Sequence, residues 1–215
     1  MDFVWEQRDV ILRGFGTTVL LAVSSGLLAF IFGTLLAVMR VGPVPPLRWA
    51  GSAYVTVVRN TPLTLVFVFC TFGLPRMEVR LAFVTFAIIA LTVYTSAFVC
   101  EAVRSGINSV EAGEIEAARA VGLPFHQILS LVVLPQAFRA VIPPLGSVYN
   151  ALVKNTSVAV AFSVAEASSI FRRLANDDAS ATWSLLLTTA VGYMALAAVV
   201  FAGARILERS TAIVR

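Results

Sequence analysis

Two basic side chains lie inside long apolar stretches of the chain, where a cation can bind a polar or anionic solute. Arg59 falls within the stretch 50–73, and Lys154 falls within the stretch 140–164. A charge that faced lipid at such a depth would cost at least about 2.5 kcal/mol. We therefore expect both side chains to face the protein interior, and the chemistry they suggest is solute passage.

Each basic residue begins a short polar pattern, basic-Asn-Thr, that interrupts its apolar stretch. Pro62, which follows the first pattern, must remove a helix hydrogen bond. Interrupted helices near the membrane midplane are where secondary transporters bind their substrates. The alternative is that both cations pair or snorkel at helix ends, while their polar neighbours join helices together. The candidate substrate-pathway residues in the two patterns are Arg59, Asn60, Thr61, Pro62, Lys154, Asn155, Thr156 and Ser157.

A polar stretch at about 105–138 predicts a helix, a turn and a second helix. Alanines favour the first helix, and Gly122 suits the left-handed residue that ends it. Pro124 suits the first turn of the next helix, in which apolar residues recur at helical spacing until Pro135 interrupts it. On periodicity alone, this is an ordinary hairpin between two membrane spans.

The elements that must position these residues are membrane-spanning helices. The chain is 59% hydrophobic and 13% charged, far from the balance of soluble proteins. A helix of about 20 apolar residues crosses a hydrocarbon core of about 30 Å. We predict an all-α fold, a polytopic transmembrane helical bundle that forms one domain over residues 1–215. The five expected spans cover about 14–39, 50–73, 81–100, 140–164 and 179–204.

The charges between the spans predict an orientation. Five spans place the termini on opposite sides, and basic residues are slightly more abundant on the side of the 105–138 hairpin. The N-terminus should therefore lie outside and the C-terminus in the cytoplasm. The net charge of +4 is scattered without a basic run, so the sequence gives no indication of a nucleic-acid partner.

Several kinds of chemistry are not supported by the sequence. It has no G-x-x-x-x-G-K-[ST] phosphate loop, so we expect ATP hydrolysis on another chain. Cys70 and Cys100 lack metal-ligand spacing, and His126 is alone. An intramembrane serine protease needs a His in another span, whereas His126 lies in the hairpin. We expect no catalytic residue, metal or cofactor on this chain.

The hairpin carries residues at fixed spacing that resemble the EAA loop of ABC-importer permeases. Val132 stands where the family consensus has Ile, which leaves the spacing intact. The resemblance implies a cytoplasmic coupling hairpin at about 105–138, seated in a groove of a separate ATPase that binds ATP and Mg. The ATPase-coupling residues that it implies are Glu116, Ala117, Ala118, Gly122, Leu134 and Pro135.

Three further motifs resemble those of polar amino acid importer permeases. They are RNTPLTL at 59–65, LVKNTS at 152–157 and EAVRSGI at 101–107, where the family has Gly in place of the Ser. The last motif adds Glu101 to the candidate substrate pathway. The alternative is that Glu101 only pairs with Arg104 three residues later, at a helix end.

The resemblance implies a type I ABC-importer permease of the bacterial cytoplasmic membrane, similar to actinobacterial glutamate-uptake permeases. Its implied partners are a second permease subunit, identical or not, two ATPase subunits and an extracytoplasmic solute-binding protein. The implied function is import of a polar amino acid, glutamate first, by alternating access, with glutamine, arginine or methionine as alternatives. A membrane scaffold or an intramembrane enzyme is the alternative from other classes, but neither explains the spacing in the hairpin.

Overall fold

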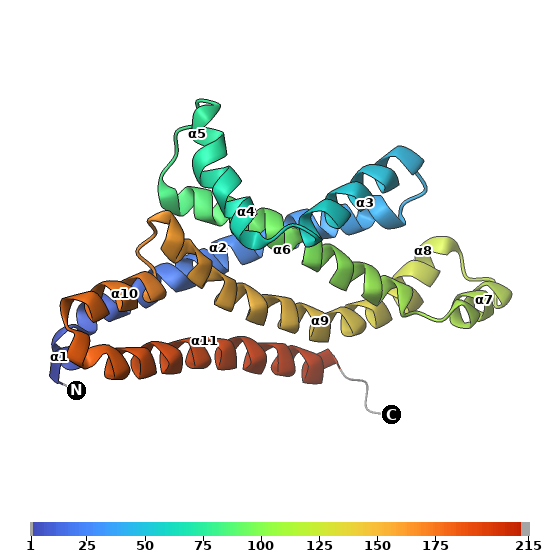
Figure 1. Ribbon diagram of the computed structural model, residues 1–215. Helices are drawn as coiled ribbons and strands as arrows, with labels where there is room; N and C mark the ends of the chain where they lie inside the picture. Colours follow the sequence, from blue (N-terminus) through green and yellow to red (C-terminus); the bar gives the residue numbers. More distant parts are fainter. Residues whose placement is uncertain (1, 212–215) are drawn as a thin grey trace.

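The computed structural model describes residues 2–211, and Figure 1 shows a chain of helices joined by short turns. The predicted all-α class is confirmed for this part of the chain. The α-helices are α1 (Asp2–Glu6), α2 (Arg8–Val41), α3 (Pro45–Arg59), α4 (Leu63–Val68), α5 (Leu74–Arg76), α6 (Phe83–Asn108), α7 (Ala112–Ala120), α8 (Phe125–Gln127), α9 (Leu134–Asn155), α10 (Ala167–Asp177) and α11 (Thr182–Thr211). Shorter elements are the π-helices Phe69–Gly73 and Ile128–Val133 and the 3-10 helices Thr156–Phe162 and Ala179–Ala181.

Four to five segments can cross a membrane by their length and composition. The four long ones are Arg8–Val41, Phe83–Asn108, Phe125–Phe162 and Ala179–Ser210. The fifth is the pair Pro45–Arg59 and Leu63–Arg76, whose two halves meet at 104°. Their order along the chain follows the order of the predicted apolar stretches.

The expected interruption at Pro62 is present, and it is a sharp bend. Helix α3 ends at Arg59 and α4 begins at Leu63, with Pro62 in an extended conformation (ψ 137°) as the N-cap. Proline has no amide hydrogen and disfavours helical backbone in the residue before it. The chain therefore leaves the axis of α3, and α4 and α5 project from the middle of the molecule (Figure 1).

The fourth expected span has different helix bounds in the structure. We expected it to begin near residue 140, but α9 begins at Leu134 and runs through Pro143 and Pro144. These prolines cannot donate to the carbonyls of Arg139 and Ala140, and a helix in an apolar environment tolerates such a loss where neighbouring groups supply other donors. The expected polar break does occur, because α9 ends at Asn155 and a 3-10 helix follows.

The core forms where α2 crosses α6 and α9. At Gly33 on α2, an added Cβ would lie 2.6 Å from the Val99 side chain and 2.7 Å from the Ser96 carbonyl oxygen on α6. Such small residues let transmembrane helices approach closely enough to pack by van der Waals contact. The largest fully buried side chains are Phe67, Leu21, Leu91, Leu152 and Leu185.

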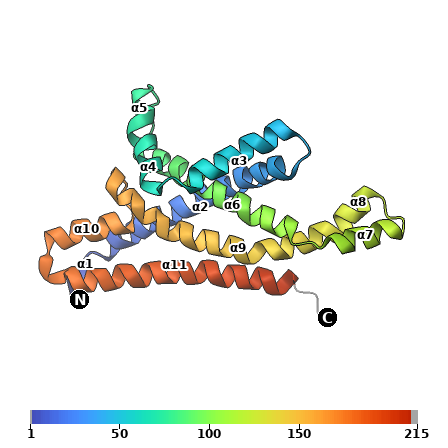
Figure 2. The same ribbon diagram turned by 45° about the vertical axis from the view of Figure 1, so that its right-hand side comes forward.

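The molecule is elongated, with different elements at its two ends. In both Figure 1 and Figure 2, α1 and the last turn of α10 lie at one end, and the α7–α8 hairpin lies at the other. Helix α11 lies beside α9 and runs toward the hairpin end. This arrangement separates the residues near the break points from the α7–α8 hairpin along the long axis.

Candidate functional site

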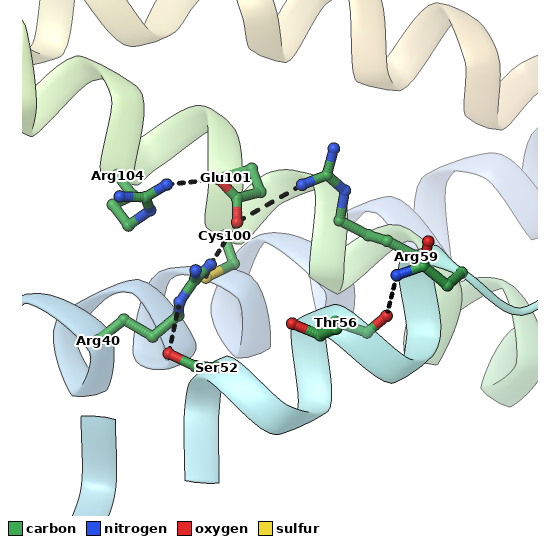
Figure 3. Close-up of polar contacts among 8 residues, drawn as sticks. Arg40, Ser52, Thr56, Arg59, Cys100, Glu101 and Arg104 are labelled. Carbon is green, nitrogen blue, oxygen red and sulfur yellow. Dashed lines mark hydrogen bonds and ion pairs between the residues drawn. The ribbon is translucent and has the colours of Figure 1, made fainter. Parts of the chain in front are cut away.

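Glu101 on α6 is surrounded by three arginines from three helices (Figure 3). It accepts a hydrogen bond from Arg40 at the end of α2 and another from Arg104 at 3.0 Å. Arg59, the last residue of α3, approaches the same carboxylate at 3.6 Å. The pairing with Arg104 agrees with the i, i+3 alternative, but Glu101 also joins α2, α3 and α6.

The arginines around Glu101 differ in how firmly they are held. The Arg40 side chain is 14% exposed and also donates to the Ser52 hydroxyl at 3.3 Å. The Arg59 side chain is 46% exposed, and its guanidinium lies over the Phe98 ring at 5.6 Å. One carboxylate faces three cations here, so the cluster keeps an excess of positive charge, and Arg59 is the cation most open to a solute.

Polar side chains that follow Arg59 and Lys154 bond to the last carbonyls of their helices. The Asn60 amide donates to the Thr56 carbonyl (2.7 Å), and the Thr61 hydroxyl donates to the Val57 carbonyl (2.8 Å). A helix end leaves carbonyls without partners, and in an apolar environment those groups need donors. The polar side chains therefore allow α3 to end inside an apolar region.

The second repeat ends α9 in the same way. The Thr156 hydroxyl donates to the Val153 carbonyl and the Ser157 hydroxyl to the Lys154 carbonyl, both at 2.7 Å. Each basic residue thus lies in the last turn of a broken helix, where a cation also interacts favourably with the helix dipole. The sequence pattern predicted the interruptions, but it did not reveal that the Asn, Thr and Ser side chains cap them.

A cleft of about 370 Å³ lies between α6 and α9 and borders the second repeat. Asn155 of α9 is in one wall, and Phe98 of α6 is in the opposite wall. The Arg59 guanidinium makes a cation–π contact with the Phe98 ring. Lys154 is exposed beside the cleft, whereas Thr156 is fully buried and does not line it. The remaining wall residues are Tyr94, Thr95, Ser147, Val148 and Ala151.

The chemistry that this cleft offers is hydrogen bonding and charge recognition. Hydroxyls, one amide and the nearby Arg59 guanidinium stand among apolar walls, which is the composition of a small-molecule site. Among residues 2–211, no group of three or more His, Cys, Asp or Glu side chains is placed to hold a metal ion. The cleft is therefore suited to binding a polar solute.

The 105–138 region forms the expected helical hairpin, and Gly122 ends α7 as predicted. Its φ is +85°, and the Leu123 amide donates to the Ala118 carbonyl while the Gly122 amide donates to that of Arg119. These are the two hydrogen bonds of a Schellman motif. Ala118 is buried, whereas Glu116 is exposed on the same helix.

The hairpin tip presents apolar side chains to its surroundings. Val121 is 76% exposed and Phe125 is 75% exposed, and both belong to the α7–α8 hairpin at one end of the molecule. Exposed apolar side chains rimmed by polar ones mark protein interaction sites. Glu116, Ala117 and Gly122 are all exposed on this hairpin, so they are available to a partner.

Pro135 does not interrupt the second helix of the hairpin as we expected. The chain stays helical through Leu134 and Pro135, because a π-helix, Ile128–Val133, comes before them. The wider π turn removes the regular i to i−4 pairing, so the missing proline amide is tolerated. Leu134 and Pro135 therefore lie at the joint between hairpin and α9, away from the tip that carries Gly122.

The structure also contains a buried carboxylate that the sequence patterns missed. Glu166 is 0% exposed and accepts hydrogen bonds from the amides of Ser168 (2.9 Å) and Ser169 (2.8 Å) at the start of α10. This residue falls between the fourth expected span, about 140–164, and the fifth, about 179–204. Its signal was an acidic residue directly before Ala-Ser-Ser in an apolar context.

Residues 29–213 match a family described as binding-protein-dependent transport system inner membrane component. The chain belongs to this family. It is therefore a permease subunit of an ABC importer, a transport protein and not an enzyme. The predicted ABC-importer permease family is confirmed, as is the type I permease fold class, and the apolar helices place the permease in the inner membrane.

Two relatives of this permease are named for the transport of different substrates. A Corynebacterium efficiens protein named glutamate transport system permease protein GluC is 42% identical over 209 residues, covering 91% of this chain and 92% of that protein. A Bacillus subtilis protein named probable glutamine ABC transporter permease protein GlnM is 42% identical over 158 residues, covering 74% and 73%. The first of these comparisons spans nearly the whole permease.

Solved structures of low sequence identity share the fold. An amino acid ABC transporter crystallised with histidines superposes with a TM-score of 0.88 at 22% identity, covering 96% of both chains. The MetNI methionine ABC transporter, in an inward-facing form, gives 0.74 at 24% identity, covering 97% of this chain and 99% of that one. The bend in α3–α4 and the broken α9 thus belong to a permease fold.

Proposed function

We propose that this permease imports a polar amino acid, with glutamate as the first candidate. Relatives from two Corynebacterium species, at 42% and 41% identity, are named for glutamate transport. The positive excess around Glu101 suits a solute with an additional carboxylate. Glutamine, arginine and methionine stay as alternatives, because relatives named for glutamine and arginine transport also match and a methionine transporter shares the fold.

The observation that carries this proposal is the cleft between α6 and α9. Its volume of about 370 Å³ suits a small solute, Asn155 of the second repeat lines it, and Arg59 of the first repeat lies over Phe98 in its wall. In our proposal the cleft is a station on the substrate pathway, where Asn155 binds the solute and Arg59 attracts a carboxylate. The exposed Lys154 also attracts the solute, the other residues of the two repeats shape the break points, and Glu101 holds Arg59 in place.

We infer that the α7–α8 hairpin couples transport to an ATPase subunit. The exposed Val121 and Phe125 at its tip suit an apolar groove on a protein partner. Glu116, on the neighbouring face, suits a polar rim. ATP and Mg would bind the ATPase, and closure of the ATPase dimer would move the hairpin and switch the spans between inward and outward access.

The proposed assembly contains two permease subunits, two ATPase subunits and an extracytoplasmic solute-binding protein. Only 6% of the most apolar part of the Ala179–Ser210 segment, which contains α11, is buried within one chain. We propose that a second subunit and lipid cover it. In the proposed orientation the hairpin end faces the cytoplasm and the α1 end faces outward. That orientation agrees with the positions of α1 and α7 at opposite ends of the molecule (Figure 1).

The test of the substrate is ATPase activity in proteoliposomes that contain the permease, its ATPase and its binding protein. L-Glutamate, L-glutamine, L-arginine and L-methionine are supplied in turn. We expect L-glutamate to stimulate ATP hydrolysis above the rate without amino acid. Stimulation by another of the four would replace glutamate by that amino acid, and no stimulation of an intact complex would contradict the importer assignment for all four.

The test of the pathway is uptake by Arg59→Ala and Lys154→Ala variants. We expect each to lower uptake about tenfold, since loss of one charged hydrogen bond to a solute costs about 1.5–3 kcal/mol. Arg76→Ala, which removes an exposed arginine at the end of α5, is the matched control and should transport normally. Wild-type uptake by both pathway variants would restrict Arg59 and Lys154 to a structural role.

A further inference from the structure

Glu166 is a carboxylate buried inside the apolar body of the protein. It precedes α10, and three donors reach its two oxygens: the amides of Ser168 and Ser169 and the Tyr193 hydroxyl at 2.7 Å. A buried charge is tolerated only when such donors replace water. The carboxylate is therefore held by groups from two helices, α10 and α11.

The same junction includes α2. The Ala167 amide donates to the Thr18 hydroxyl of α2 at 3.2 Å, and the Tyr193 hydroxyl lies 3.0 Å from that of Ser168. The Tyr193 ring packs edge-on against Phe15, also on α2, with centroids 5.8 Å apart. Helices α2, α10 and α11 thus meet at Glu166 and Tyr193, as the side-by-side course of these helices in Figure 1 allows.

This junction holds the segment that follows Lys154. Thr156, at the start of this segment, is fully buried, and its hydroxyl donates to the Val153 carbonyl at 2.7 Å. From Thr156 a 3-10 helix leads to Ser163, whose φ of +58° is left-handed, and then to Glu166. Glu166 and Ser168 lie where this turn enters α10, so Tyr193, which bonds to both, holds the far end of the turn.

We propose that Glu166 and Tyr193 are positioning residues, which hold the turn from Lys154 to Glu166 in the geometry that presents Asn155 to the cleft. This inference rests on the pathway role proposed above for Lys154 and Asn155. Neither residue touches the solute, because Glu166 has no exposed surface and Tyr193 is absent from the cleft wall. Their effect reaches the solute only through the turn.

The competing explanation is that Glu166 only caps α10. Capping needs a side-chain oxygen that accepts from the first amides, and Asp is a preferred N-cap residue. The variant Glu166→Asp keeps that function but is one methylene too short to keep its bond with Tyr193. Tyr193→Phe leaves the cap intact and removes the contacts of the tyrosine hydroxyl with Glu166 and Ser168. The two variants therefore separate a junction from a cap.

The experiment uses the complete complex in proteoliposomes and compares both single variants with their double variant. Uptake of L-glutamate gives KM and maximal rate, and hydrogen exchange of the complex follows the amides of 156–163. Tyr149→Phe is the matched control. It likewise removes one tyrosine hydroxyl, which in this case bonds to the Gly26 carbonyl of α2. Lys154→Ala is measured in parallel to test the pathway role itself.

We expect Tyr193→Phe and Glu166→Asp each to raise KM about fivefold to tenfold and to speed exchange in 156–163, while Tyr149→Phe changes neither. The double variant should be no worse than Tyr193→Phe alone, because that variant already removes the Glu166–Tyr193 bond. Normal KM and exchange in both variants would overturn the proposal and leave a cap. If Lys154→Ala transports normally, the pathway role fails, and hydrogen exchange alone then decides whether the junction holds the turn.

Discussion

At the scale of single residues, Glu101 determines how three helices meet. Its pair with Arg40 is the most buried of its ion pairs, with side chains 23% and 14% exposed, whereas Arg59 is farther away and more exposed. Exposed ion pairs contribute little, but removal of one partner from a buried set leaves charges without compensation. The stability of the cluster therefore depends on Glu101 and Arg40, and Arg59, as the most exposed of the three arginines, is the one that a solute can reach.

We predict that Glu101→Gln lowers the free energy of unfolding by about 1–3 kcal/mol, because three guanidiniums lose their only carboxylate in the cluster. Thermal unfolding of the purified permease in detergent measures the change. A variant that also carries Arg40→Gln should lose less than the sum of the single losses, since the two residues are coupled. Glu111→Gln, at an exposed position before α7, is the control. If the Glu101→Gln protein unfolds at the same temperature as the wild type, the cluster contributes no stability.

At the scale of elements, helix breaks and π turns define where the permease bends. Both π-helices, Phe69–Gly73 and Ile128–Val133, end directly before a Leu-Pro pair, at Pro75 and Pro135. An extra residue in a helical turn rotates what precedes it by about 100° relative to a regular α-helix. The π turn thus changes the direction of side chains at the hairpin joint, and the proline that follows it does not end the helix.

The hairpin offers a matched pair of glycines for a prediction on local stability. Gly122 has φ +85°, Gly113 lies inside α7, and an added Cβ would meet nothing within 4 Å at either position. Gly122→Ala should therefore destabilise the end of α7 by about 1 kcal/mol through backbone strain alone, and Gly113→Ala should stabilise α7 by about the same amount. Hydrogen exchange of the α7 amides measures both changes. Equal exchange in the two variants would argue against a required left-handed residue.

Some of this architecture could be predicted from the sequence because its causes are local. The Pro62 break and the left-handed Gly122 follow from the backbone limits of those residue types, and the apolar stretches follow from composition. The contacts of Glu101 with Arg40 and of Glu166 with Tyr193 could not be predicted, because they join residues far apart in the chain. Periodicity also missed the π turn before Pro135, since it assumes a regular helix.

At the scale of the whole molecule, the two ends carry different tasks. The α7–α8 end presents apolar and acidic side chains on a short hairpin. The other end contains α1 and the last turn of α10. The cleft and the junction lie between them, on helices that extend toward both ends. A shift of the hairpin can therefore reach the cleft through α9, which leads directly from the hairpin to Asn155.

This arrangement predicts which parts of the permease a membrane-impermeant thiol reagent reaches. Asn176→Cys, near the end of α10, should be labelled in intact spheroplasts, whereas Arg119→Cys, on α7, should be labelled only after permeabilisation. Both positions are exposed, so burial does not limit the reaction. The wild-type chain serves as the blank, because Cys70 and Cys100 are only 3% and 0% exposed. Labelling in the reverse order would place the hairpin outside the cell, away from ATP, and would contradict both the orientation and the coupling role.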